Sequence, residues 1–275
     1  MTAVNPAVEA RGHYGPFGQL RSEWIKLRTV RSTLWSLGVT VVAVVGIGAI
    51  ATAVTAAHWR NGGIIERVGF DPTARSLAGV FLGQIVIGVL GVLVMSAEYS
   101  SGTIKATLSA IPNRPLVLVC KSVVFGIVAL VTSEILTFCA FLLGQRLLQG
   151  STPYATLSEP KALRAVVGAG LVLCVLGLFA LGIATIVRHT AGSIATYVGL
   201  LLIVPLILQA FPASVQHSAI RFMPLVIGEN MASTVPTHDF GGATLFSPWA
   251  GFGVLCGYTI FLLVVGGILM VRRDS

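Results

Sequence analysis

Residues 165–187 read AVVGAGLVLCVLGLFALGIATIV, and none of them is charged. Because a helix rises 1.5 Å per residue, about 20 apolar residues are enough to cross the hydrocarbon core of a bilayer. The run is continuously apolar and lacks the alternation of apolar and polar residues found in strands of membrane barrels. It therefore predicts a membrane-spanning helix.

Five further stretches share this character, and the six together organise the chain. The predicted spans are residues 33–57, 77–97, 122–143, 165–187, 192–211 and 249–271. Of the 275 residues, 55% are hydrophobic and only 10% charged, with a mean hydropathy of +0.89, whereas an average soluble domain is about 25% charged. We therefore exclude a soluble fold. We predict a cytoplasmic N-terminal segment (residues 1–32), a six-span domain (33–271) and a short tail (272–275).

The distribution of Lys and Arg predicts the orientation of the spans. With the N-terminus inside, the inner segments hold 11 of the 18 Lys and Arg residues, which agrees with the excess of positive charge in cytoplasmic loops. Both termini are then cytoplasmic. The formal net charge of +8 favours attraction to anionic lipid of the cytoplasmic leaflet, and we expect no nucleic-acid partner.

The segment before the first span, residues 17–35, has the pattern of a basic amphipathic helix. Phe17, Leu20, Trp24 and Leu27 recur at helical spacing, while charged residues occupy the other faces. Such a helix is suited to lying along the membrane surface. Two interpretations stay open, a plain juxtamembrane anchor and a role in coupling to a partner.

The connection between the second and third spans is the most informative stretch outside the membrane. Residues 98–112 read EYSSGTIKATLSAIP. Ser100 or Ser101 can cap a short helix, and a proline ends it. Ile104, Leu108 and Ile111 then share one apolar face. This pattern predicts a short cytoplasmic helix that a partner can grip, or a loop that packs on its own bundle.

This segment resembles ABC transporter permeases of the ABC-2 type, the six-span subunits that pair with a separate ATPase. The matching pattern, from Glu98 to Lys121, is E-x3-G-T-x4-L-x3-P-x-R-x6-K. A second match is SEWIKLRTVRSTLW at residues 22–35. A third is SPWAGF at residues 247–252, followed by an apolar span that ends in Arg-Arg-Asp at 272–274. The resemblance covers essentially the whole chain.

The resemblance implies roles for two groups of residues and for one loop. The segment 98–112 would be a coupling helix seated on the ATPase, and the helix over residues 17–31 an elbow helix beside it. The loop 212–248 would hold short outer helices. The implied coupling residues are Glu98, Gly102, Thr103, Ile104, Lys105, Leu108, Ile111, Pro112 and Arg114, and the implied elbow residues are Glu23, Trp24, Lys26, Leu27 and Arg28. The predicted fold class is thus an all-α membrane protein with six spans, an amphipathic elbow helix and a coupling helix.

The resemblance also implies a function and its partners. The chain would be the permease subunit of an ATP-driven exporter in the bacterial plasma membrane. A second copy or a related permease would complete the translocation pathway, and two copies of an ABC ATPase would bind ATP and Mg. We expect no cofactor, metal or catalytic residue in this chain itself.

Glu134 is the single charged residue within the six predicted spans. A carboxylate at membrane depth is costly unless it is partnered, neutral or close to water. One hypothesis is a group that contacts substrate or carries a proton along the pathway. The alternative is a structural role, either an interhelical hydrogen bond or an ion pair with an arginine such as Arg164.

Other functional classes have weaker support in the sequence. The chain lacks a G-x-x-x-x-G-K-[ST] phosphate loop and an H-E-x-x-H zinc motif, and its five histidines are scattered. The four cysteines show no C-x-x-C spacing and are interpreted as small core residues. Two alternatives to transport stay open, namely a membrane-embedded enzyme built from several spans and a sensor or anchor that recruits a cytoplasmic partner.

Overall fold

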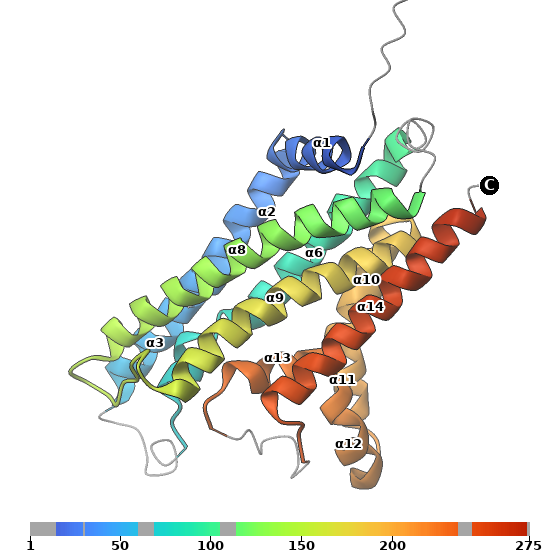
Figure 1. Cartoon of the computed structure of the whole chain (residues 1–275). Helices are drawn as coiled ribbons and strands as arrows, with labels where there is room; N and C mark the ends of the chain where they lie inside the picture. The colour runs from blue at the N-terminus through green and yellow to red at the C-terminus, as the bar shows by residue number, and fades with distance from the viewer. Residues whose placement is uncertain (1–14, 30, 60–68, 105–113, 236–243, 274–275) are drawn as a thin grey trace, which may run out of the picture.

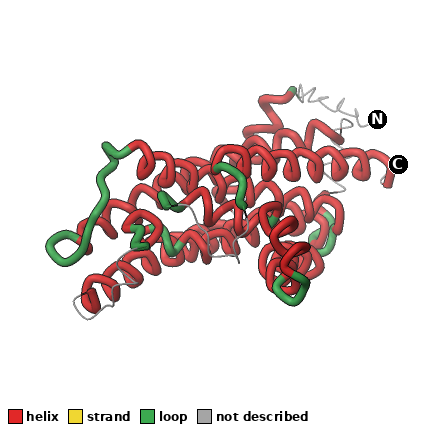
Figure 2. The backbone as a smooth tube through the Cα atoms, turned by 90° about the horizontal axis from the view of Figure 1, so that it is seen from below, coloured by secondary structure: helices red, strands yellow, loops and turns green. Residues whose placement is uncertain are grey.

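The computed structural model describes residues 15–29, 31–59, 69–104, 114–235 and 244–273. Within these ranges the chain forms helices and loops, with no strand (Figure 2). Six of the helical segments are long and apolar enough to cross a membrane. The predicted class, an all-α membrane protein with six spans, is confirmed.

Four spans are single helices and two are composite. The single helices are α6 (Val80–Ser100), α8 (Arg114–Leu148), α9 (Pro160–Val187) and α14 (Pro248–Arg273). The first span consists of α2 (Arg31–Val41), the π-helical segment η1 (Val42–Gly46) and α3 (Ile47–His58). The fifth consists of α10 (Thr190–Val198), the π-helical segment η3 (Gly199–Ile203) and α11 (Val204–Leu208).

Short helices lie at the two ends of this bundle (Figure 1). Helix α1 (Pro16–Thr29) lies across the end at which α6 and α14 finish and α8 begins, here named the α1 end. Helix α5 (Pro72–Ser76) precedes α6 at the opposite end, named the α5 end. The loop predicted over residues 212–248 contains α12 (Ala213–Ala219), the 3₁₀ turn η4 (Ile220–Phe222) and α13 (Pro224–Ala232) among its described residues.

Helix α9 is the central element of the bundle. In its most apolar window 78% of the residues are buried, against 22% for the sixth span, and it packs against α6, α8, α13 and α14. Glycines allow the close approach. A side chain at Gly91 of α6 would overlap the carbonyl oxygen of Gly177 in α9, and one at Gly168 would overlap Met231 of α13. Small residues at helix contacts are typical of membrane bundles.

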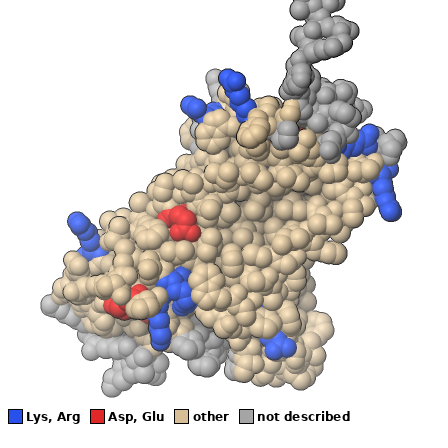
Figure 3. All heavy atoms as spheres, in the orientation of Figure 1, with Lys and Arg blue, Asp and Glu red and all other residues tan. Residues whose placement is uncertain are grey.

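The outward faces of the spans are strongly apolar. On α8, Val119, Val123, Ile127, Val131 and Ile135 recur every fourth residue and are exposed. On the face drawn in Figure 3, Lys and Arg lie toward the ends of the molecule, and most of the surface between them is uncharged. An apolar stripe of this length is too large for a water-facing surface and fits contact with lipid.

Candidate functional site

Three segments that are far apart in sequence bring four charged side chains together at the α1 end. Helix α1 contributes Glu23 and Lys26, the last turns of α6 contribute Glu98, and the second turn of α8 contributes Lys121. We name these four residues the charge cluster. Along the chain, Glu98 lies just before and Lys121 lies soon after the segment 101–113 that joins α6 to α8.

The four groups are linked in a closed ring of ion pairs. The Lys121 ammonium lies 2.6 Å from a carboxylate oxygen of Glu23 and 2.8 Å from one of Glu98. The Lys26 ammonium lies 2.8 Å from oxygens of the same two carboxylates. In addition, the side-chain amide of Gln19 donates a hydrogen bond of 3.1 Å to Glu23. Each carboxylate therefore receives both cations.

Most of the cluster is withdrawn from solvent. Glu23 and Lys121 are each 2% exposed, and Glu98 is also buried, whereas the Lys26 side chain is 37% exposed. Burial by itself lowers the pKa of Lys26, but the hydrogen bonds and charges of Glu23 and Glu98 outweigh it, so that the pKa is raised above its usual 10.5. The protonated Lys26 accordingly contributes its full stabilisation of the folded state below pH 10.5. This contribution is lost as the pH rises through the higher pKa of the folded state.

The sequence of α1 explains why its charged side faces inward. Gln19, Glu23 and Lys26 follow one another at intervals of four and three residues and so share one helix face. That face packs on the bundle, while Phe17, which is 85% exposed, and Trp24 point away from it. An outward apolar face is what a helix lying in the membrane interface requires. Of the other predicted elbow residues, Leu27 is half-buried, and Arg28 is exposed with its guanidinium 6.0 Å from the Trp24 ring.

The predicted coupling residues fall partly within the described chain. Gly102 has φ of +72°, a left-handed conformation that glycine adopts without strain. It lets the chain turn after α6, so that helix begins again at Thr103, which is exposed, and Ile104, which is buried. The remaining predicted coupling residues before Arg114, which are Lys105, Leu108, Ile111 and Pro112, lie outside the described residues, and the coupling helix stays a prediction.

Arg114, the last of the predicted coupling residues, joins the start of α8 to the end of α14. Its guanidinium donates to the carbonyl oxygens of Met270 and Val271, at 3.4 and 3.1 Å. Arg188, which follows α9, donates to the carbonyl of Leu269 at 3.2 Å. Carbonyls in the last turn of a helix have no partner within the helix. Arg114 therefore caps the final turn of α14, and Arg188 binds the turn just before it.

Glu134 lies midway along α8 and is half-buried. Its carboxylate rests on Gly170 of α9, where an added Cβ would lie 2.6 Å from the carboxyl carbon. Among the described residues no side chain is hydrogen-bonded or ion-paired to this carboxylate. The hypothesis of an ion pair with Arg164 is not supported, because that guanidinium donates to the carbonyls of Met231 and Ser233 instead. The structure leaves the choice between a pathway role and a structural role untested.

The α5 end is held together by hydrogen bonds between side chains and backbone. One carboxylate oxygen of Asp71 accepts the amides of Thr73 and Ala74, which caps α5. The other accepts three donors from residues 233–235, just after α13. Gln145 of α8 donates to the carbonyl of Pro72 at 2.9 Å. The link between the first two spans is thereby fastened to α8 and to the segment after α13.

The amino-acid sequence of the chain also matches a known protein family. The sequence model of a family described as ABC-2 family transporter protein matches residues 19–206, more than half of the chain. The chain belongs to the ABC-2 family of transporter membrane proteins. Permeases of this family are membrane subunits of ABC transporters and generally work with an ABC ATPase partner. A comparison with curated proteins finds no match.

The matched region of this ABC-2 permease contains all four residues of the charge cluster and Glu134. It ends within the fifth span, so that α12, α13 and α14 lie beyond it. The six spans and the family together make the chain a multi-pass membrane protein. Among its described residues no three His, Cys, Asp or Glu side chains come close enough to hold a metal ion.

Sequence reasoning identified most of the site residues but not how they are connected. Glu23, Lys26 and Glu98 were predicted as members of two separate groups, and Lys121 only as the last position of the family pattern. Gln19 was placed on the polar side of the amphipathic helix but not among the site residues, although its spacing of four residues before Glu23 is a usable signal. The tie between α1 and the two helices that flank the coupling segment emerges only from the three-dimensional contacts.

Proposed function

We propose that this ABC-2 permease is the membrane subunit of an ATP-driven exporter in the bacterial plasma membrane. In this proposal a second permease copy, or a related permease, completes the pathway, and both termini are cytoplasmic. Two copies of a separate ABC ATPase bind ATP and Mg beneath the α1 end. The segment 101–113 docks on that ATPase, and its motion alters which side of the pathway is open.

The observation that carries the proposal is the charge cluster. Glu98 and Lys121 stand on the two helices that flank segment 101–113. Glu98 is paired with Lys26 of α1, Lys121 is paired with Glu23 of α1, and Lys121 also binds Glu98. Because separating buried charges is costly, we expect α1 and the adjoining ends of α6 and α8 to move as one body. A push on the segment would then tilt the second and third spans together.

A further contact extends this body toward the sixth span. Arg114, which stands directly after the segment, holds the last carbonyls of α14. Displacement of the start of α8 would therefore also displace the end of α14. Movement of packed helices between two discrete arrangements is the usual way in which a local push becomes a change in access.

The test is co-purification of the tagged permease with the ATPase encoded beside it, together with the ATPase rate in nanodiscs. Lys26→Gln removes two ion pairs of the cluster at its most exposed member. Arg21→Gln is the matched control, because Arg21 is an exposed cation of the same helix. We expect both variants to bind the ATPase, and only Lys26→Gln to lower the stimulation of ATP hydrolysis by the permease.

A second arm addresses the docking segment. Leu108→Asp combined with Ile111→Asp places two charges on its predicted apolar face, and we expect the complex to dissociate. If the intact chain binds no ATPase while both proteins are folded, the proposed coupling is wrong. If the Lys26→Gln variant and the Leu108→Asp/Ile111→Asp variant both bind the ATPase and stimulate it as the unchanged permease does, the charge cluster and the segment have no role in coupling.

A further inference from the structure

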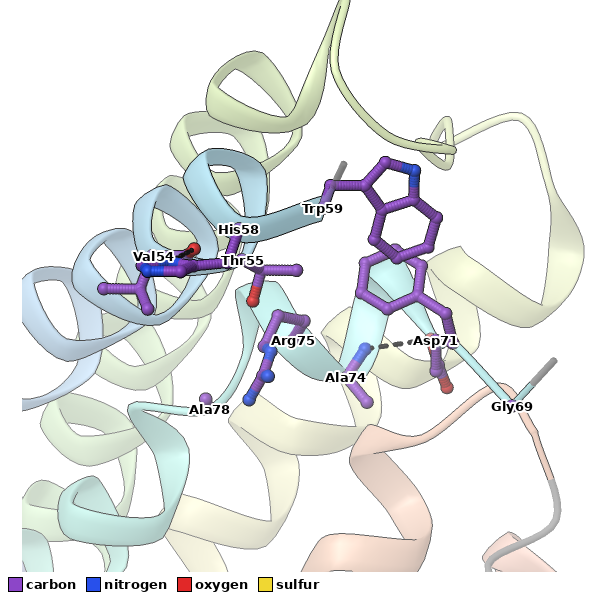
Figure 4. A pocket seen from close by; sticks show the side chains of 10 residues that line it. Val54, Thr55, His58, Trp59, Gly69, Asp71, Ala74, Arg75 and Ala78 are labelled. Carbon is purple, nitrogen blue, oxygen red and sulfur yellow. Dashed lines mark hydrogen bonds between the residues drawn. The ribbon is translucent and has the colours of Figure 1, made fainter. Parts of the chain in front are cut away.

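A pocket of about 500 Å³ opens at the α5 end, between the last turns of α3 and helix α5. Its volume lies within the range of sites that hold small ligands. Its lining combines one arginine, one histidine and two aromatic rings with small apolar side chains (Figure 4). Neither the family nor the proposed coupling assigns it a role.

Arg75 supplies the pocket with a cation that no described residue satisfies. Its side chain is exposed, and among the described residues no acceptor bonds to its guanidinium. Figure 4 shows it beside the turn of α3 that carries Thr55 and His58. The acidic residue of the pocket, Asp71, is engaged elsewhere, because its two oxygens accept five hydrogen bonds from α5 and residues 233–235. A guanidinium with unused donors favours a planar or tetrahedral anion.

His58 and Thr55 add polar atoms on the α3 side. The Nδ1 atom of His58 lies 2.9 Å from the carbonyl oxygen of Val54, and since a carbonyl can only accept, Nδ1 carries a proton. Its Nε2 atom is therefore an acceptor in the neutral ring and a second cationic donor in the protonated one. The Thr55 hydroxyl donates to Ala51 at 2.8 Å, which leaves its oxygen lone pairs for a ligand hydroxyl.

The remaining wall is apolar and leads down into the membrane. Trp59 and Phe70 pack against each other with their ring centroids 4.7 Å apart and their planes inclined at 56°, and aromatic residues of this kind are enriched at membrane interfaces. Below them Val54 lines the pocket. Val54 and Ile50, one turn apart on α3, are exposed, so that the apolar surface continues from the pocket along the lipid-facing side of α3.

We propose that this pocket binds an anionic phospholipid from the leaflet at the α5 end. Arg75 binds the phosphate, and the Trp59–Phe70 wall packs against the glycerol region. One acyl chain follows Val54 and Ile50 into the bilayer, and the Thr55 oxygen accepts a headgroup hydroxyl. This inference does not depend on ATPase coupling, and its test uses the permease alone.

The experiment uses a chain in which Trp24, Trp35 and Trp249 are replaced by Phe, so that Trp59 is the sole tryptophan. Phosphatidylglycerol with brominated acyl chains, which quenches tryptophan on contact, is titrated into micelles of this protein, and brominated phosphatidylcholine serves as the zwitterionic comparison. We expect half-maximal quenching at a mole fraction of phosphatidylglycerol about 5-fold lower than of phosphatidylcholine, which corresponds to one charge-assisted contact.

Two variants and one competitor decide the outcome. Arg75→Gln should abolish the preference for phosphatidylglycerol. Arg146→Gln, which removes an exposed arginine at the same end outside the pocket, should preserve it. Equal quenching by both lipids, or an equal response of both variants, overturns the proposal. If excess inorganic phosphate reverses the quenching, the site takes a free anion and the lipid assignment is wrong.

Discussion

The two ends of this permease are fastened by different chemistry. At the α1 end, charged side chains bind one another, and the four ion pairs of the charge cluster join α1, α6 and α8. At the α5 end, polar side chains bind mostly backbone groups. Asp71 accepts amides, while Arg164 and Gln145 donate to carbonyls.

The difference determines how each end responds to change. The buried charges of the cluster neutralise one another. The loss of one member therefore leaves an uncompensated buried charge, which destabilises the contacts among α1, α6 and α8. Bonds to backbone groups are individually worth about 1 kcal/mol and are lost one at a time. The α1 end therefore suits a junction that moves as a unit, and the α5 end suits a fixed frame.

The largest effect is expected from Lys121→Met. It leaves the carboxylates of Glu23 and Glu98 buried with only Lys26 to share, and we expect the free energy of unfolding to fall by about 3–5 kcal/mol. Denaturant titration in micelles measures the change. Lys161→Met, at an exposed lysine of the α5 end, is the control and should have almost no effect.

A double variant sharpens this result. Combining Lys121→Met with Glu23→Gln removes one charge of each sign and leaves Lys26 paired with Glu98. We expect the double variant to be at least about 1 kcal/mol more stable than the sum of the two single effects predicts. Simple additivity would mean that the charges do not act as a set.

At the α5 end, Asp71→Ala removes the acceptors of five hydrogen bonds. Because the freed amides of α5 and residues 234–235 can turn to water, we expect a smaller loss, about 2–3 kcal/mol. Faster hydrogen exchange of those amides is the direct measurement. Asp71→Asn keeps one acceptor oxygen and should protect one of the two groups of amides; a loss as large as that of Lys121→Met would contradict the distinction between the ends.

Between the two ends, the Glu134–Gly170 contact offers a comparison within the membrane. Gly170→Ala would place a Cβ 2.6 Å from the Glu134 carboxyl carbon, and we expect a cost of about 1–2 kcal/mol from overpacking. Glu134→Ala should relieve that cost in the double variant. Gly91→Ala is the control. Its added Cβ would overlap the backbone of Gly177, so Glu134→Ala should not reduce the cost of this substitution. If Gly170→Ala lowers the free energy of unfolding equally with and without Glu134→Ala, the overpacking does not arise from the Glu134 carboxylate.

How much of this could be predicted from the sequence differs between the fold and the site. The six spans follow from apolar runs, since the hydrocarbon thickness fixes their length. The amphipathic pattern of residues 17–35 predicted an interfacial helix, but it could not show that the charged face of α1 is the buried one. That depends on where Glu98 and Lys121 lie in space. The pairing of Arg164 with backbone carbonyls likewise depends on the path of the loop after α13, which no local pattern specifies.

The smallest effect is expected at Glu229 on α13, which contrasts with the paired carboxylates of the charge cluster. Burial raises the pKa of Glu229 above its usual 4.5, and among the described residues none donates to its carboxylate. The folded chain therefore holds this proton more tightly than the unfolded one, and stability is lost as the pH rises from about 4.5 through the folded-state pKa. Glu229→Gln removes the charge, so we expect it to raise the free energy of unfolding by less than about 1 kcal/mol at pH ~8 and to leave it unchanged at pH ~4. Denaturant titration at the two pH values tests this, with the exposed Glu159→Gln as control. Destabilisation at the higher pH would mean that Glu229 has an ionic partner, and the α5 end would then resemble the α1 end more than its described contacts indicate.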